Sequence, residues 1–490
     1  MRAQAERFGI VEGSEWYPAF LVAGASAAFL LLSQVINPVF LTAVLLAAPC
    51  VALAYFRPLP GFLCYLVAIQ MVDYFKRLLL AFGNPSPIEW YGILLLPDLM
   101  LFAVLAGVLA AGEKGSTARV RGPKYQAVAW GLCLYAGWYT VRAVWTAAPM
   151  VNAVGKWKLL IPYFVCFYIG ESLLSNNAAL RSVIKVLAAT VGVASLYGIW
   201  QFFFGLTSFE QLWLFGGHTI LAPETLLYGD GMSRAFSLYS DPATFGSMLA
   251  IVGTLLLFSR RMFGPHWWNS WPVLALIGAA LVATVVRAAW LQAFLGGIVF
   301  FWTQWRVRRT WKILALGALI VGLVGASWLL VSLFVGVDNP LLARAVVVGT
   351  YSDRTTGFRN LLEMGIIGSV SGRGVATMPG SVRDISGASP DAYLIAHDYL
   401  TESLYELGWI GFGLFLFIIV RTLSGRSPSF IGPLGPALKF LVWSVPIIAM
   451  LFSGSLLAVR PVATLLWSGA GVLCAEHVRR EECGPQQRES

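Results

Sequence analysis

Charged residues are scarce in this chain. Only 12% of its 490 residues are Asp, Glu, Lys or Arg, and 58% are hydrophobic, whereas ordinary soluble proteins carry about 25% charged residues. This composition excludes a soluble globular protein. The formal net charge of +10 does not indicate a nucleic-acid partner, because the basic residues are scattered among apolar runs rather than gathered on one polar face.

Cysteine and histidine are also few, with 6 and 4 in the whole chain. The cysteines lie in apolar runs, except for Cys483 near the C-terminus, so we expect neither a disulfide nor a metal cluster. The first 16 residues contain Glu6, Glu12 and Glu15 and lack the basic start of a signal peptide. We therefore expect the first apolar run to remain in the mature protein.

Long apolar runs make up most of the sequence. A membrane span needs about 20 mainly apolar residues, and about fourteen runs approach this criterion, which predicts an all-α, polytopic membrane protein with about 12–14 transmembrane helices. The pairs 267–304 and 437–476 are also compatible with re-entrant hairpins. The predicted spans are 17–35, 38–56, 59–75, 89–111, 125–147, 158–175, 182–205, 242–259, 267–285, 288–304, 313–335, 403–420, 437–456 and 459–476.

The positive-inside rule predicts the orientation of these spans. With the N-terminus in the cytoplasm, every basic cluster but one falls on the cytoplasmic side, and the exception, Lys76-Arg77, is interpreted as a pair that snorkels at a helix end. The predicted regions are a cytoplasmic N-terminus 1–16, N-terminal helices 17–205, a first periplasmic loop 206–241, central helices 242–337, a large periplasmic loop with short helices 338–402, C-terminal helices 403–476 and a cytoplasmic tail 477–490.

The polar stretch 338–402 is the strongest candidate for a functional site. It contains Arg354, Arg359, Arg373 and Arg383, and His397 is the one histidine that shares its loop with several arginines. His397 is either an interfacial residue that caps the next helix or a general base, since a neutral imidazole can take a proton from a sugar hydroxyl. Several guanidiniums on the side away from the cytoplasm fit an anionic substrate that binds in a bidentate way, such as a diphosphate.

Two further arginines lie at junctions of apolar runs. Arg287 begins a span, where a charge is costly unless it is paired or meets water or a ligand. It is either a snorkelling residue or a second anion ligand. Arg234 precedes the Asp241-Pro242 that opens another span, and the same alternatives, structural or anion-binding, apply to it.

The order of these motifs resembles the O-antigen ligase and O-antigen polymerase superfamily over residues 230–425. The resemblance rests on a series of segments along the chain: Arg234-Ala-Phe-Ser-Leu-Tyr-Ser-Asp-Pro, Arg287-Ala-Ala-Trp, Arg354 with Phe358, Gly372-Arg373-Gly374, His397-Asp-Tyr-Leu and Glu406-Leu-Gly-Trp-Ile-Gly.

The resemblance implies an inverting, metal-independent glycosyltransferase without cofactors in a bacterial inner membrane, with its active site facing the periplasm. It implies a glycan donor on undecaprenyl diphosphate and an acceptor hydroxyl on a second glycan or on lipid A core. His397 matches the family's proposed base, and Arg287 and Arg354 match the arginines that hold the diphosphate; Arg359 competes with Arg354 for this role, and Arg373 and Arg234 are further candidates. The length and number of spans favour a polymerase over a ligase, with a chain-length regulator or a flippase as a partner besides membrane lipid.

A transporter or flippase is the alternative from another functional class. Asp73, Asp98, Arg142 and Glu171 lie in or near apolar runs, and charges within the membrane often mark ion or proton pathways. Neither an inverted repeat nor paired Gly/Pro breaks support a transporter.

Overall fold

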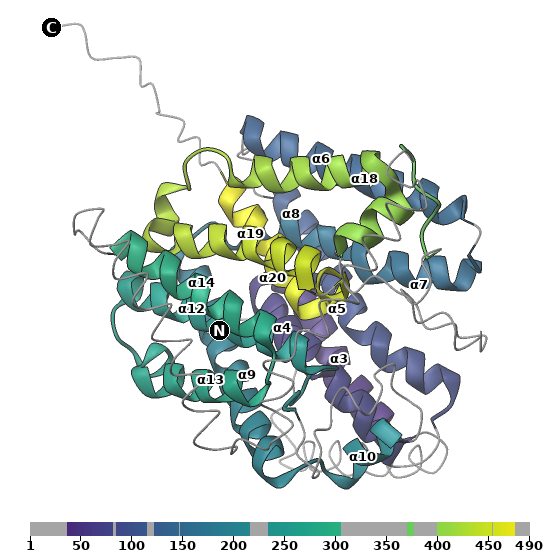
Figure 1. The fold of residues 1–490 in the computed structure, drawn as a ribbon, viewed down its shortest axis with the longest axis vertical. Helices are drawn as coiled ribbons and strands as arrows, with labels where there is room; N and C mark the ends of the chain where they lie inside the picture. Colours follow the sequence, from purple (N-terminus) through teal and green to yellow (C-terminus); the bar gives the residue numbers. More distant parts are fainter. Residues whose placement is uncertain are drawn as a thin grey trace, which may run out of the picture.

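A computed structural model describes residues 37–81, 85–114, 122–146, 148–215, 234–304, 370–376, 399–452 and 454–475 (Figure 1). Over these residues the chain is helical and contains no strand. The helices are α3 Pro38–Phe56, α4 Pro58–Ala81, α5 Pro87–Lys114, α6 Pro123–Val144, α7 Met150–Leu160, η2 Ile161–Phe164, α8 Val165–Leu173, α9 Asn177–Phe204, α10 Ser208–Phe215, α12 Pro242–Phe263, η4 Trp267–Asn269, α13 Trp271–Ala283, α14 Arg287–Gln304, α18 Tyr399–Leu423, η7 Ser429–Leu434, α19 Gly435–Phe452, η8 Gly454–Ala458 and α20 Arg460–Cys474.

Among the described residues, 7 helices are long and apolar enough to cross a membrane. The prediction of an all-α polytopic membrane protein is therefore confirmed. The predicted total of about 12–14 spans extends over residues that the structure does not describe, including the runs 17–35 and 313–335. The 7 spans are Pro38–Phe56, Pro58–Ala81, Pro87–Ala111, Asn177–Phe204, Pro242–Phe263, Tyr399–Leu423 and Ser429–Met450.

Proline and polar caps determine where many of these helices begin. Proline is the first residue of α3, α4, α5, α6 and α12, where its missing N–H is one that the helix could not pair internally. The side chains of Asn37, Asn176 and Asp241 then accept backbone N–H groups from the first turns of α3, α9 and α12. The helix starts are thus encoded locally.

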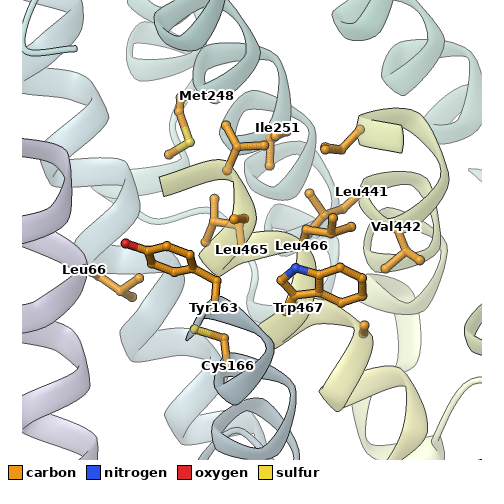
Figure 2. Close-up of a cluster of buried hydrophobic side chains, with 14 of the residues drawn as sticks. Leu66, Tyr163, Cys166, Met248, Ile251, Leu441, Val442, Leu465, Leu466 and Trp467 are labelled. Carbon is orange, nitrogen blue, oxygen red and sulfur yellow. The ribbon is translucent and has the colours of Figure 1, made fainter. Parts of the chain in front are cut away.

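The core of the molecule surrounds α20. Every residue of this helix is buried, although its 15 residues span only about 22 Å at 1.5 Å per residue. Figure 1 shows α20 in the middle of the molecule, and Figure 2 shows its side chains meeting residues from α4, η2, α8, α12 and α19. Trp467 and Leu466 lie among Leu66, Tyr163, Cys166, Met248, Ile251, Leu441 and Val442.

Two predicted segments differ from the structure. The predicted span 158–175 is divided into the end of α7, η2 and α8, because Pro162 lacks an N–H and its ring clashes with the preceding turn of a continuous helix. The predicted first loop 206–241 contains a short helix, α10, in its first part, and its residues Ala235 to Tyr239 are buried.

Contacts between helix ends define how neighbouring helices align. Lys124, at the start of α6, donates to the carbonyl of Leu473 at the end of α20 (3.0 Å). Arg181, near the start of α9, contacts His266, which follows α12 (Nη2 to Nε2, 2.6 Å). These contacts join ends that the predicted alternation assigns to one side of the membrane. Which side faces the periplasm stays a prediction.

Candidate functional site

Arg287 is the first residue of α14, and its side chain is exposed. The turn before it is held by side chains. Thr284 Oγ1 donates to Leu281 O (2.7 Å) and accepts the Val286 N–H (3.3 Å), and Trp290 Nε1 donates to the same Leu281 O (2.8 Å). A cation at a helix N-terminus is opposed by the helix macrodipole. Arg287 therefore does not stabilise its own helix, and with the helix N–H groups it favours an anion at this end.

Arg234 lies next to the same turn. The N–H of Ala235 donates to the carbonyl of Ala283, the last residue of α13 (3.1 Å). The segment is fixed from α9, since Gln201 Oε1 accepts the N–H of Ser237 (2.6 Å) and Ser237 Oγ donates to the α9 carbonyl of Ala194 (2.6 Å). Arg234 and Arg287, two candidate anion ligands, are far apart in sequence but lie on adjoining backbone segments that hydrogen bonds hold in place.

Arg77 corrects the interpretation of Lys76-Arg77 as a snorkelling pair. Its side chain is 1% exposed and forms a 3.0 Å ion pair with Glu210 of α10, which is 0% exposed. It also donates to Ser237 O (2.5 Å) and lies 4.8 Å from the centre of the Phe236 ring. The Glu210 carboxylate accepts further hydrogen bonds from Tyr197, Gln201 and Thr207.

The buried Arg77–Glu210 pair connects α4, α9 and α10 with the segment that follows Arg234. One feature of the sequence pointed to Arg77: the Lys76-Arg77 pair was the exception to the predicted alternation of basic residues. Nothing in the sequence identified Glu210 as its partner, because the two residues are separated by 133 positions.

The third described candidate, Arg373, lies on the segment 370–376, which binds to a break in α18. Gly408 interrupts the helix with φ 68° and ψ −169°, and such a break releases backbone groups that a continuous helix would pair. The segment 370–376 binds them. The three bonds run from Arg373 N to Tyr405 O (2.8 Å), from Gly374 N to Glu406 O (3.0 Å) and from Ile410 N to Val370 O (3.2 Å).

The glycines that flank Arg373 allow this close approach. A Cβ at Gly372 would lie 2.4 Å from the carbonyl oxygen of Glu406, and one at Gly374 would lie 2.9 Å from Thr146 Cα. Both glycines also have positive φ angles, 74° and 113°, which side chains disfavour. The backbone conformation and close packing therefore explain the two glycines of the Gly-Arg-Gly motif. The arginine side chain between them is exposed.

The end of α6 holds the other edge of the segment 370–376. Arg142 Nη2 donates to Gly372 O (2.6 Å), Val375 N donates to Arg142 O (3.1 Å), and Thr146 Oγ1 donates to Val375 O (2.7 Å). The Arg373 guanidinium lies 5.5 Å from the centre of the Tyr405 ring, within the range of a cation–π contact. Arg373 is thus presented from a segment that two helices fix.

A buried group of charges lies at the start of α18. Lys156 of α7 contacts the carboxylates of both Glu402 and Glu406, with 2.7 Å between Lys156 Nζ and Glu406 Oε2. Burial disfavours the ammonium form of Lys156, but the two carboxylates outweigh it and raise the pKa of this lysine above its ordinary value. No sequence pattern singled out Lys156, which lies outside the long polar loops.

Charges that suggested a transporter have partners within the protein. Asp98 accepts a hydrogen bond from Tyr163 (2.9 Å) and pairs with Lys158 (3.3 Å). Arg142 binds the carbonyl of Gly372, and Glu171 accepts from Ser172 (3.1 Å). The contacts of Asp98 and Arg142 join separate elements, whereas that of Glu171 lies within α8, so three of the four charges have a described partner in the protein.

The predicted site residues divide into two groups. Arg234, Arg287 and Arg373 are described: the first two lie on adjoining segments, and Arg373 is held by α6 and α18. His397, Arg354 and Arg359 lie outside the described residues, so their roles stay predictions. Helix α18, as described, begins at Tyr399, two positions after His397.

Part of the chain that contains Arg287 and Arg373 matches a known protein family. Residues 272–416 match the family model described as O-antigen ligase. This region, 272–416, is similar to the O-antigen ligase family and is called the O-antigen ligase domain below. The match confirms the resemblance inferred from the motifs, and the matched range contains Arg287, Arg373, Glu402 and Glu406.

The O-antigen ligase domain covers α13, α14, the segment 370–376 and most of α18. The family indicates a membrane glycosyltransferase of the O-antigen ligase or polymerase type that acts on lipid-linked glycans. No curated protein matches the chain. Arg234 and Lys156 lie before the matched range and contact or adjoin elements within it.

Proposed function

We propose that this protein transfers a glycan from undecaprenyl diphosphate to a sugar hydroxyl at the periplasmic face of a bacterial inner membrane. The observation that carries the proposal is the position of Arg287 within the O-antigen ligase domain. Its exposed guanidinium stands at a helix N-terminus, where it costs the helix stability and favours an anion. Arg234 on the adjoining segment adds a second guanidinium for the same diphosphate.

The chemistry is a single displacement at the anomeric carbon. The acceptor oxygen forms a bond to this carbon as the bond to the diphosphate oxygen breaks, which inverts the anomeric configuration. His397 takes the proton of the acceptor hydroxyl. The leaving lipid diphosphate gains negative charge, and Arg287 with Arg354 or Arg359 stabilises it, supported by Arg373 and Arg234. Because guanidiniums neutralise this charge, the proposed reaction uses no metal ion.

The acceptor separates a polymerase from a ligase. We favour a polymerase, which joins a second lipid-linked unit, because the about fourteen apolar runs of the chain exceed the about twelve spans usual in ligases. A flippase that delivers the donor or a regulator of chain length would be a partner of either enzyme.

Transfer by the purified protein tests the proposal. A lipid-linked oligosaccharide is supplied as donor, and lipid A core and a second lipid-linked unit compete as acceptors. We expect a product on the second lipid-linked unit, without added divalent cation and with inverted anomeric configuration. A product confined to lipid A core would instead identify a ligase, and no transfer to either acceptor would contradict the proposed function.

A further inference from the structure

Lys156 lies on α7, outside the O-antigen ligase domain, but it bridges two carboxylates inside that domain. Glu402 and Glu406 are four positions apart on α18, so their side chains lie on one face of the helix. Their side chains are 13% and 2% exposed, and that of Lys156 is 12% exposed. Two like charges at this spacing and burial repel each other, and the Lys156 ammonium compensates both.

Glu406 connects this ion group to Arg373. Its side chain pairs with Lys156, while its backbone carbonyl accepts the N–H of Gly374 (3.0 Å). The neighbouring carbonyl of Tyr405 accepts the N–H of Arg373 itself (2.8 Å), and the Tyr405 ring lies under the Arg373 guanidinium. A shift of this helical turn therefore shifts both the backbone and the aromatic ring that place Arg373.

The rest of the surrounding framework is already held from α6. Tyr135 and Tyr399 share a hydrogen bond between their hydroxyls (2.6 Å), Trp138 Nε1 donates to Leu407 O (2.9 Å), and Arg142 binds Gly372 O. The first two contacts fix the start of α18 on one side, and the third fixes the segment 370–376. Lys156 approaches from α7 and sets the position of the turn that carries Glu406.

We propose that Lys156 is a positioning residue for Arg373, acting through Glu402 and Glu406 on the broken start of α18. The ligand of Arg373 is the diphosphate of the lipid-linked donor, and in this respect the inference rests on the proposed function. Lys156 itself contacts carboxylates of the protein, not the donor. Its loss changes affinity for the diphosphate by displacing the guanidinium that binds it.

Binding of undecaprenyl diphosphate to the purified full-length protein tests this role without requiring transfer. We expect Lys156→Met to weaken binding about tenfold, and Lys156→Arg, which keeps the charge, to restore most of it. Lys158→Met is the matched control, because Lys158 lies on the same helix and pairs with Asp98 rather than with α18. It should leave binding within about twofold of the wild type.

A double-mutant cycle with Arg373→Ala separates positioning from general destabilisation. If Lys156 acts through Arg373, Lys156→Met adds little to the weakening that Arg373→Ala alone produces. If the variant does not fold, Lys156→Gln, whose amide can still donate to one carboxylate, replaces it in the same cycle.

Additive losses, unchanged binding in both Lys156 variants, or a wild-type protein that does not bind the diphosphate would overturn the inference. Diphosphate binding with the expected cycle but without glycan transfer would contradict the proposed function and leave the inference standing.

Discussion

At the scale of single residues, the charges of this protein fall into two kinds. Arg77 and Glu210 are fully enclosed and satisfied by each other and by neighbouring polar groups. The side chains of Arg287 and Arg373 are exposed on rigidly held backbone. An enclosed ion pair stabilises an arrangement of helices, whereas an exposed guanidinium on fixed backbone is suited to a ligand that arrives from outside.

Arg287 gives the first residue-scale prediction. Arg287→Ala should lower the transfer rate by about 100-fold to 1,000-fold, the usual cost of removing a group that stabilises charge in a transition state. Arg287→Lys should not restore the rate, because an ammonium cannot reproduce the bidentate guanidinium. Initial rates with a lipid-linked donor measure both effects.

The control for Arg287 is Arg383→Ala, an arginine of the long loop to which we assign no principal phosphate role. It should retain most of the activity. Equal losses in Arg287→Ala and Arg383→Ala would show that our assignment of the phosphate ligands is wrong.

At the scale of elements, the broken helix α18 is the feature that organises the described site. At its break, two carbonyls and one N–H of α18 form hydrogen bonds with the segment 370–376. The same segment is bound by α6, so a discontinuity that would weaken an isolated helix becomes the junction of three pieces of chain. Gly408 makes this possible through its positive φ and its lack of a side chain.

Gly408→Ala should destabilise the protein by at least about 1–3 kcal/mol, the cost of a left-handed conformation in a residue with a side chain. The added Cβ would lie 2.4 Å from Gly372 N and 2.5 Å from Val370 O, and neither backbone atom can move without disturbing the segment. Thermal unfolding of the purified protein in detergent measures the effect.

Gly413→Ala is the control on the same helix. A Cβ there meets nothing within 4 Å, and alanine is the better helix former by up to about 1 kcal/mol. The control should therefore unfold at the same temperature as the wild type or slightly higher. If both variants unfold at the wild-type temperature, the break in α18 does not depend on Gly408.

At the scale of the whole molecule, polar contacts join several helix ends, and apolar side chains form the core around α20. The core around α20 joins helices from both halves of the sequence. The O-antigen ligase domain is therefore not an independent unit: its α18 and α14 pack with helices that lie outside the matched range.

The predicted orientation of the molecule has a direct test at the two ends of α18. Ser371, held near the start of the helix, and Ser429, beyond its end, are both exposed. With the 6 native cysteines replaced, Ser371→Cys should react in intact cells with a maleimide that cannot cross the inner membrane. Ser429→Cys should react only after the membrane is opened. The reverse pattern would place the described site in the cytoplasm.

Apolar length and proline made much of the helical pattern predictable. The predicted span 38–56 coincides with α3, and the predicted start at Pro242 coincides with that of α12, because the length of an apolar run and the proline that precedes it are local properties. The same local evidence could not detect that α7 begins at Met150, since its sequence mixes apolar and basic residues.

The site was predictable where a charge was out of place in an apolar context. Arg287 was found in this way, whereas Arg373 was selected as one of several arginines in the polar stretch 338–402; both are exposed in the structure. Glu210 and Lys156 were missed because their importance comes from partners 133 and 250 positions away. Such pairings depend on the packing of helices, which one sequence does not reveal.

The enclosure of α20 has a consequence for how the protein is made. A nascent chain emerges in order from the N-terminus, so every other described helix enters the membrane before its central neighbour exists. The earlier helices must then either leave a vacancy or stay loosely associated until α20 arrives. Assembly of the bundle is therefore completed by its last described helix, and a ribosome that stalls before residue 460 would leave a set of inserted helices with nothing to close around.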